Sequence, residues 1–302
     1  MQVHRDSVEI VVQTPAKLNL FFEVLAKRTD GYHEIETLMC PIDLYDTLYF
    51  REETSERIEL ECQWGSSADG HGGFGFEDVP RGPGNLVFRA VDLVRRRTGV
   101  TRGARLRLVK RIPSAAGLGG GSSDAAAALV AANLGWNLGL GPDALARLAA
   151  ELGSDVPFFL AGGPAVCRGR GERIEPVAGL GALDFVVVRP PEGLSTAAVY
   201  GVCRPAEQPR PLAPLVDALR QGDIEQAGRL LLNRLQPAAE ELSPWIVRLR
   251  RCFAAEDCLG HGMSGSGTAY FGLCHHARHA RRMARRLRAN GLGCVVAVRS
   301  CR

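Results

Sequence analysis

The sequence lacks the features that mark secreted, membrane-spanning or zinc-binding proteins. Nine cysteines are spread over 302 residues and no two form a Cys-x-x-Cys pair, so neither a zinc ribbon nor a disulfide framework is expected. No apolar run reaches eighteen residues, and the first thirteen residues carry charges where a signal peptide needs an apolar core. We therefore expect a cytoplasmic protein that has no membrane partner.

Strong charge of either sign is also missing. Lysine and arginine total 37 and aspartate and glutamate 33, which gives a formal net charge of +4. This balance suits an anionic small-molecule substrate and is too weak to indicate nucleic-acid binding. Aromatic residues make up only 6%, whereas glycine is abundant, with 35 residues. Abundant glycine predicts tight turns and close approach of the backbone to ligands.

Apolar periodicity predicts strands in the first half of the chain and mostly helices in the second. Residues 8–12 and 18–25 resemble two strands, and Asp30-Gly31 predicts a turn after them. This is an α+β plan. A Gly-Gly-Pro seam at residues 162–164 predicts two domains, residues 1–163 and 164–302. The glycine-rich stretch 65–84 is expected to be a surface loop, with a lid as the alternative.

Residues 113–123, called the phosphate loop below, carry the strongest functional signal. They read Pro113-Ser114-Ala115-Ala116-Gly117-Leu118-Gly119-Gly120-Gly121-Ser122-Ser123, with a strand predicted before them and an alanine-rich helix over 125–133 after them. Glycines at a helix start expose N–H groups at the positive end of the helix dipole, where phosphate binds. The alternative is a flexible turn in which serine caps the helix.

Other nucleotide loops do not fit the spacing. A Walker A loop needs Lys directly after its last glycine, and none follows here. A phosphoryl transfer also needs a group that orients the attacking hydroxyl. Asp124 and Asp155 are the candidates, but Asp124 could balance the helix dipole, and Asp155 could cap a short helix led by Pro157. From the residues alone, the choice between the two stays open.

Four separated segments resemble the GHMP kinases, and the resemblance spans nearly the whole chain. The segments are Pro15-Ala16-Lys17-Leu18-Asn19-Leu20 with Arg28-Thr29-Asp30-Gly31-Tyr32-His33, then residues 113–126, residues 152–159 and residues 262–268. The resemblance implies a two-domain α+β GHMP kinase fold with the active site in the interdomain cleft. It also implies that ATP, with Mg²⁺, phosphorylates the hydroxyl of a small molecule. The first segment is similar to the branch whose substrate is a cytidyl-capped methylerythritol, phosphorylated on its 2-hydroxyl.

The resemblance further implies roles for individual residues. Asp155 would accept the proton of the substrate hydroxyl, and Lys17 would hold that geometry and offset negative charge. Tyr32 and Tyr200 would stack on the cytosine, and His33 would hydrogen-bond the base edge.

The remaining implied contacts are less specific. Asn19 would contact the methylerythritol, and Thr196 would line the same pocket. Asn85 would touch the adenine side or cap its helix, and Lys110 would face the nucleotide or be an exposed strand lysine. Ser123 is expected to contact magnesium. Alanine stands at 115 and 116, where relatives often carry another glycine, and it fits only if φ is negative there.

Three rival interpretations follow from the same residues. Another GHMP kinase substrate, such as homoserine or a mevalonate derivative, has no base for Tyr32 and His33 to contact. A regulatory nucleotide-binding protein without turnover would not need Lys17 and Asp155. The basic stretch 274–288 resembles a metal cluster or a nucleic-acid helix, but its six arginines would repel a cation, and its apolar stripe predicts a solvated arginine face. A monomer and a weak homodimer both stay open.

Overall fold

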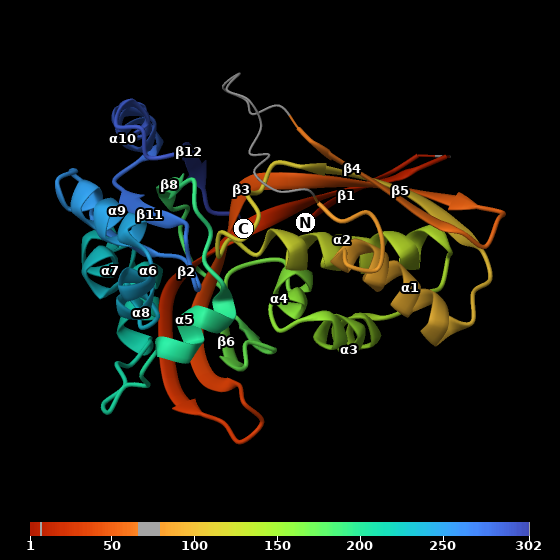
Figure 1. The fold of residues 1–302 in the computed structure, drawn as a ribbon, viewed down its shortest axis with the longest axis horizontal. Coiled ribbons are helices and arrows are strands. Elements are labelled where there is room, and N and C mark those ends of the chain that lie inside the picture. The colour runs from red at the N-terminus through yellow and green to blue at the C-terminus, as the bar shows by residue number, and fades with distance from the viewer. Residues whose placement is uncertain (7, 66–78, 302) are drawn as a thin grey trace. The chain divides into compact units, whose positions relative to one another are not determined.

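The structure, a computed structural model, describes residues 1–6, 8–65 and 79–301 (Figure 1). Its residues group into two compact units. The first unit is residues 1–16, 44–114 and 119–162, and the second is residues 17–43, 115–118 and 163–302. The chain changes unit after Gly162, close to the seam in the sequence, but a continuous first domain of residues 1–163 is not observed. The expected lid falls mostly on residues 66–78, which lie outside the described residues.

The strands, in chain order, are β1 (Gln2–Arg5), β2 (Ile10–Lys27), β3 (His33–Glu53), β4 (Ile58–Trp64), β5 (Gly103–Lys110), β6 (Ala165–Gly169), β7 (Arg173–Pro176), β8 (Asp184–Arg189), β9 (Leu232–Asn233), β10 (Gly260–Met263), β11 (Tyr270–Cys274) and β12 (Cys294–Arg299). The helices are α1 (Leu86–Thr98), α2 (Gly120–Gly135), α3 (Pro142–Leu152), α4 (Val156–Leu160), α5 (Thr196–Val202), α6 (Ala213–Gln221), α7 (Ile224–Leu230), α8 (Gln236–Leu242), α9 (Pro244–Ala254) and α10 (Ala277–Ala289).

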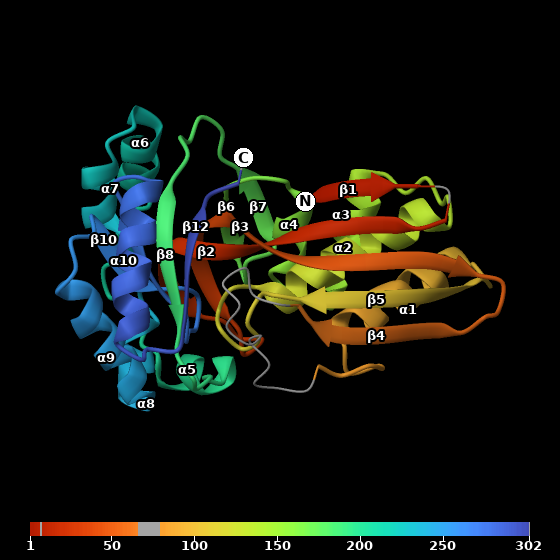
Figure 2. The ribbon, with the colours of Figure 1, turned by 90° about the horizontal axis from the view of Figure 1, so that it is seen from above.

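The first unit is a sheet with helices α1–α4 on one face (Figures 1 and 2). The strand order is β1-β2-β3-β5-β4, in which β3 pairs antiparallel and β4 parallel with β5. Helix α2 lies among α1, α3 and α4. Its alanines 125–128, 131 and 132 have no exposed surface, because small side chains allow neighbouring helices to approach closely. This central packing fixes the start of α2, where the phosphate loop ends.

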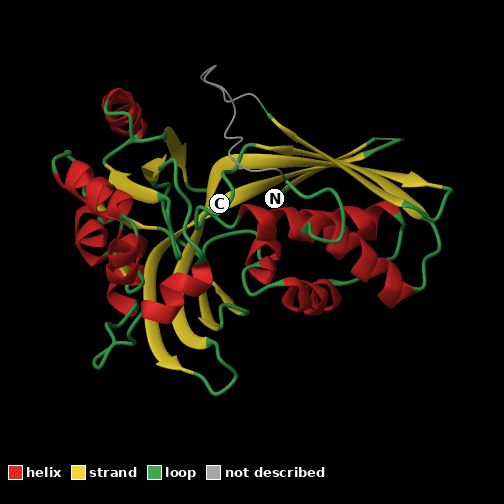
Figure 3. Cartoon of the chain, in the orientation of Figure 1, coloured by secondary structure: helices red, strands yellow, loops and turns green. Residues whose placement is uncertain are grey.

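The second unit contains an antiparallel sheet of order β10-β11-β8-β12, with α9 and α10 packed on it (Figure 3). Phe253, Tyr270 and Met283 are fully buried in its core. In the same unit, β9 pairs parallel with β2, and the β6–β7 hairpin pairs with β3. The second unit therefore joins segments that are far apart in the sequence, including both sides of the 17–43 segment.

Two elements differ from the expectations. The two strands predicted over 8–12 and 18–25 are one strand, β2, because residues 14–24 are buried without alternation. Helix α2 begins at Gly120 rather than Ala125, so the glycines and serines form its first turn.

The basic helix α10 has the predicted apolar stripe. Ala280, Met283, Ala284 and Leu287 are buried, and the arginines between them are mostly exposed. His276 caps the helix by accepting a hydrogen bond from the His279 amide at 3.1 Å. In the described part of the chain, no helix combines the length and apolarity needed to cross a bilayer.

Candidate active site

The middle of the phosphate loop turns its carbonyl groups into the second unit. The Ala116 carbonyl accepts a hydrogen bond from the Ala269 amide at 2.9 Å, and the Leu118 carbonyl accepts one from the Lys17 amide at 2.9 Å. Between them, the Gly117 carbonyl accepts from the Ser264 hydroxyl at 3.0 Å. These bonds attach the loop directly to the residue predicted to be the catalytic lysine.

Three alternate residues of this loop have a left-handed backbone. The φ angles are +48° at Ala115, +73° at Gly117 and +71° at Gly119. Alternation of this kind is typical of backbone nests, whose successive N–H groups bind anions. A Cβ atom at residue 117 would lie 2.0 Å from the Ser264 carbonyl oxygen, so only glycine fits there. The loop geometry thus supports the phosphate-binding prediction.

Ala115 overturns one detail of the sequence reasoning. Alanine was expected to fit only with negative φ, yet Ala115 is left-handed and exposed. A non-glycine residue in this region carries strain of about 1–3 kcal/mol.

The start of α2 rules out the serine-cap alternative. Its N-cap is Gly119, and no side chain among the described residues caps it. Ser122 and Ser123 lie inside the first turn. Ser123 has no exposed surface and donates its hydroxyl to the Pro15 carbonyl at 2.6 Å. This hydroxyl points into the first unit, so the expected Mg²⁺ contact by Ser123 does not fit the structure.

A buried ion cluster anchors the beginning of the phosphate loop in the first unit. The Lys110 ammonium bridges the carboxylates of Asp46 and Asp124, with a distance of 2.6 Å to Asp124. The same Asp46 carboxylate accepts hydrogen bonds from the amides of Arg111 and Ile112, the latter at 2.8 Å. The cluster therefore ties the end of β5 to the first residues of the loop and to α2.

Burial and charge shift the pKa values within this cluster. Burial raises the pKa of Asp124 well above its usual range, against the opposing effect of Lys110. Burial alone would lower the pKa of Lys110, but Asp124 and Asp46 raise it. Lys110 is only 3% exposed, so the alternative that it is an exposed lysine of the strand is wrong. Asp124 is the fifth residue of α2 and pairs with Lys110, which corrects the helix-dipole interpretation.

Lys17 lies on β2 in the second unit and is held by a neutral partner. Its ammonium donates to Asn19 Oδ1 at 2.5 Å. Asn19 Nδ2 in turn donates to the Thr37 hydroxyl at 2.8 Å, and Asn19 is 1% exposed. The side-chain amide of Asn19 thus contacts a protein group at each end, and its oxygen orients Lys17. Its contact with the substrate stays a prediction.

Asp155 occupies the N-cap position of the short helix α4 in the first unit. Its side chain accepts no capping hydrogen bond from this helix, among the residues described. The simple capping alternative for Asp155 is therefore wrong. The residue is half-buried, directly before Val156 and Pro157. The expected cleft between the domains stays a prediction.

The predicted base-binding residues lie in the second unit. Tyr32 stands at the turn between β2 and β3, is 53% exposed, and carries the Arg170 guanidinium 4.7 Å from its ring centroid. The rings of His33 and Tyr200 pack with centroids 5.0 Å apart. Burial, and to a smaller extent Lys27, lowers the pKa of His33. This shift favours the neutral imidazole of His33.

Two of the less specific predictions have clear structural outcomes. Thr196 is exposed at the start of α5, with its hydroxyl 2.8 Å from that of Ser266. Asn85 is the N-cap of α1: its side-chain oxygen accepts from the Val87 amide at 2.8 Å, and its Nδ2 donates to the Pro80 carbonyl at 2.7 Å. The capping alternative describes Asn85, and its contact to adenine stays a prediction.

Family models match both parts of the chain. The model of the GHMP kinases N terminal domain matches residues 85–163, and the model of the GHMP kinases C terminal domain matches residues 215–292. The chain belongs to the GHMP kinase family. The resemblance drawn from four short segments is thereby confirmed, together with the α+β GHMP kinase fold.

Full-length relatives narrow the position of this GHMP kinase within its family. The 4-diphosphocytidyl-2-C-methyl-D-erythritol kinase of Pelotomaculum thermopropionicum is 44% identical, covering 90% of this chain and 92% of the relative. That of Bacillus cytotoxicus is 38% identical, with coverage of 91% and 92%. A crystal structure of a 4-(cytidine 5'-diphospho)-2C-methyl-D-erythritol kinase superposes with a TM-score of 0.78 at 38% identity, covering 96% of this chain and 98% of that one.

More distant family members share the fold alone. The crystal structure of L. major mevalonate kinase in complex with R-mevalonate has a TM-score of 0.72 at 16% identity, covering 99% of this chain and 96% of that one. Fold similarity at this identity carries no information on the substrate. The argument for a substrate therefore depends on the residues around Tyr32 and on the relatives of higher identity.

The sequence reasoning missed several residues that shape the site of this GHMP kinase. Asp46 is one, because a single aspartate in a strand gives no signal of a buried ion cluster. Arg170 is another, since the short β6–β7 hairpin was not predicted. Ser264 lay within a matched segment, but its bond to the phosphate loop only becomes visible in three dimensions.

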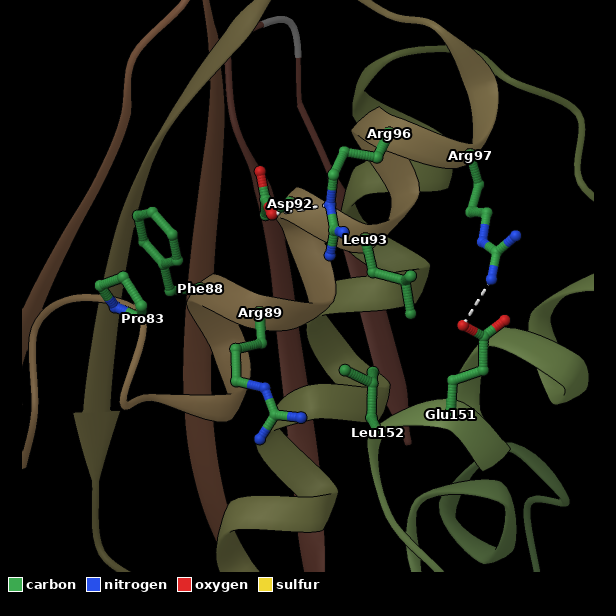
Figure 4. A pocket seen from close by; sticks show the side chains of 9 residues that line it. All are labelled: Pro83, Phe88, Arg89, Asp92, Leu93, Arg96, Arg97, Glu151 and Leu152. Carbon is green, nitrogen blue, oxygen red and sulfur yellow. Dashed lines mark hydrogen bonds and ion pairs between the residues drawn. The ribbon is translucent and has the colours of Figure 1, made fainter.

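A separate hollow in the first unit involves none of the predicted site residues (Figure 4). Its volume is about 340 Å³, and residues of α1 and the end of α3 line it. Ion pairs occupy its rim: Arg97 with Glu151 at 2.8 Å and Arg96 with Asp92 at 2.9 Å. Paired charges on an open helix surface are typical of a solvated face.

Within the described residues, no group of three or more His, Cys, Asp or Glu side chains is arranged to hold a metal ion. Mg²⁺ in kinases is commonly held by one or two carboxylates together with substrate phosphates.

Proposed function

We propose that this GHMP kinase transfers the γ-phosphoryl group of ATP to the 2-hydroxyl of 4-diphosphocytidyl-2-C-methyl-D-erythritol. The product would be the 2-phosphate, an intermediate of the non-mevalonate route to isopentenyl diphosphate. The substrate follows from relatives of 38–44% identity over nine-tenths of the chain. The structural observation that carries the proposal is Lys17, whose amide binds the phosphate loop and whose ammonium is oriented by Asn19.

Lys17 and Asp155 form the catalytic pair in this proposal. Asp155 accepts the proton of the substrate's 2-hydroxyl, while the oxygen of that hydroxyl forms a bond to the γ-phosphorus of ATP. The bond from that phosphorus to the bridging oxygen breaks, and ADP leaves. Lys17 stabilises the negative charge on the transferring oxygens, which is the main demand of this reaction.

The phosphate loop binds the ATP phosphates in this proposal. Its left-handed residues aim successive N–H groups at one side, and the uncapped start of α2 adds further donors and a positive dipole end. Bound Mg²⁺ supplies positive charge to the triphosphate.

Tyr32, His33 and Tyr200 bind the cytosine in this proposal. Tyr32 is 53% exposed and so offers ring surface for stacking, beside the Arg170 guanidinium 4.7 Å from its ring centroid. The lowered pKa of His33 favours its neutral imidazole, in which one ring nitrogen donates and the other accepts hydrogen bonds. Thr196, on the same helix as Tyr200, supplies a further polar group, and its hydroxyl lies 2.8 Å from that of Ser266.

The first experiment is release of ADP by the purified protein with ATP and Mg²⁺. The cytidyl substrate is compared with homoserine, mevalonate and galactose. We expect turnover with the cytidyl substrate alone. Turnover with another alcohol alone would retain the kinase and remove the base-binding argument. Absence of turnover with all four would favour a regulatory nucleotide-binding protein. Sedimentation of the same sample distinguishes the monomer from the weak homodimer.

Replacement of Asp155 tests the catalytic pair. We expect Asp155→Asn to lower kcat by about 10²–10⁴-fold, the range of a general base, with ATP binding retained in calorimetry. Asp143→Asn is the matched control, because Asp143 is an exposed acid at the start of α3. Unchanged turnover of Asp155→Asn would exclude Asp155 from the mechanism.

A further inference from the structure

Residues 263–268, called the 263–268 turn below, connect β10 to β11 and border the Lys17 ammonium. Gly265 has a φ of +56°. A Cβ atom at this position would lie 3.2 Å from Lys17 Nζ and 3.3 Å from Asn19 Oδ1. The backbone of Gly265 therefore forms one wall of the space in which the ammonium sits. A shift of this backbone changes the position that Lys17 can occupy.

The same turn binds both the phosphate loop and Asn19, the residue that orients Lys17. The Ser264 hydroxyl donates to the Gly117 carbonyl at 3.0 Å and accepts from the Asn19 amide at 3.2 Å. The Ser264 amide donates to the Ala269 carbonyl at 2.9 Å, which closes the turn. One short turn thus fixes the phosphate loop and the residue that orients Lys17.

Asn233 holds this turn from behind. It lies on β9, which pairs with β2 at Phe22. Its Nδ2 donates to the Met263 carbonyl at 2.7 Å and to the Gly265 carbonyl at 2.8 Å, on either side of Ser264. Its Oδ1 accepts from the Leu235 amide at 2.9 Å. Both N–H groups of the buried Asn233 amide are therefore used to fix two carbonyls of the turn.

We propose that Asn233 is a positioning residue for phosphoryl transfer, which holds the 263–268 turn so that Lys17 stays in its productive place. The inference rests on the proposed catalytic role of Lys17. Asn233 is linked to Lys17 indirectly, through Gly265 and through the Ser264–Asn19 contact. A side chain with two donors is required, because two carbonyl oxygens face it.

Asn233→Asp tests this role with almost no change in shape. A carboxylate has no N–H to donate and places negative charge against two carbonyl oxygens, so the turn moves. We expect kcat to fall about 10–100-fold, while KM for ATP and for the cytidyl substrate changes less than about threefold, because small displacements of a catalytic group act mainly on the chemical step. Asn233→Ser, which is neutral and smaller, is made in parallel in case the aspartate variant does not fold.

Arg234→Gln is the matched control on the adjacent residue. Its guanidinium pairs with the buried Glu23 carboxylate at 2.7 and 3.0 Å. This change removes a comparable buried interaction without touching the turn. We expect it to lower the melting temperature at least as much as Asn233→Ser and to leave kcat within about twofold. An equal loss of kcat in both variants would reduce Asn233 to a structural residue and overturn the inference.

A double-mutant cycle separates this inference from the proposed function. In a Lys17→Met background, Asn233→Asp should lower the residual rate by less than about twofold, because the group that it positions is gone. A full additive loss would overturn the positioning role. Wild-type kcat in Lys17→Met would instead contradict the proposed catalytic pair. If both Asn233 variants keep the wild-type kcat while Lys17→Met is inactive, the positioning role of Asn233 is overturned and the proposed catalytic role of Lys17 is retained.

Discussion

The beginning of the phosphate loop is anchored by buried charge in the first unit, whereas its middle is anchored by neutral hydrogen bonds in the second. Lys110, Asp46 and Asp124 form the charged anchor. The neutral anchor consists of Ser264 and Asn19, which lead to Lys17. Both anchors are buried, so the difference does not reflect access to water.

One anchor uses charged groups and the other neutral groups because they hold different things: the neutral anchor positions the Lys17 ammonium, and the charged anchor positions backbone amides. An ammonium that stabilises transferring phosphate oxygens must be held in place, and the neutral amide oxygen of Asn19 orients it without adding negative charge. The Lys110 cluster holds backbone amides of the loop entrance and can use full charges. Buried charges are strongly coupled to one another, so loss of one partner has large consequences there. Loss of a neutral partner near Lys17 should affect the rate more than the stability.

The largest effect is expected from removal of the cation in the charged anchor. Lys110→Met leaves the buried carboxylates of Asp46 and Asp124 facing each other without compensation. We expect the free energy of unfolding to fall by about 3–5 kcal/mol, as for other broken buried pairs. Urea denaturation followed by circular dichroism measures this change. A loss below about 1 kcal/mol would show that the cluster does not anchor the loop entrance.

Asp124→Asn is the matched variant within the same cluster. Lys110 keeps Asp46 as its partner, so we expect stability within about 1 kcal/mol of the wild type at pH 7. Burial raises the pKa of Asp124, so the folded carboxyl holds its proton more tightly than the unfolded one. This contribution to stability is present at low pH and is lost as pH rises through the raised pKa. Relative to Asp124→Asn, the wild type should therefore lose stability from pH 4 to pH 8; the opposite slope would contradict the direction of the shift.

The next effect tests the neutral anchor through the charge on Asn19. Asn19→Asp keeps the shape but pairs Lys17 with a carboxylate. We expect kcat to fall about 100-fold, comparable to the loss of one transition-state donor, with stability within about 1 kcal/mol. Steady-state kinetics and thermal unfolding at pH 8 measure both. Asn19→Ala removes the orientation without adding charge. If it proves as damaging as Asn19→Asp, position rather than charge explains the use of a neutral residue.

Some features of the site could be predicted from the sequence, and others could not. Local spacing predicted the phosphate loop, because glycines between a strand and an alanine-rich helix have a direct backbone meaning. The predicted turn at Asp30-Gly31 is observed, with the Asp30 carboxylate accepting from the Tyr32 amide at 3.1 Å. These features are contained within a few consecutive residues.

Features that depend on distant partners were not accessible in this way. Lys110 was read as an exposed or nucleotide-facing lysine, since its partner Asp46 is 64 residues away. The contacts of the Asn19 side-chain amide with Lys17 and Thr37 have no signal in the sequence. No role was predicted for Asn233, since its partners Met263 and Gly265 lie about thirty residues further on. A side chain's role in a buried network becomes visible only when the fold assembles it.

The smallest effect concerns the strain at Ala115 in the neutrally anchored part of the loop. Ala115→Gly removes a left-handed alanine, which relieves about 1–2 kcal/mol, but glycine adds entropy to the unfolded chain, which opposes this by about 0.4–1 kcal/mol. We expect the free energy of unfolding to rise by less than about 1 kcal/mol. Ala161→Gly is the control, because Ala161 is an exposed alanine of the first unit with φ of −71°. It has no strain to lose, so the same substitution should only destabilise. Equal losses in urea denaturation of both variants would mean that Ala115 is unstrained, and that the loop holds its anion site without the left-handed residue at 115.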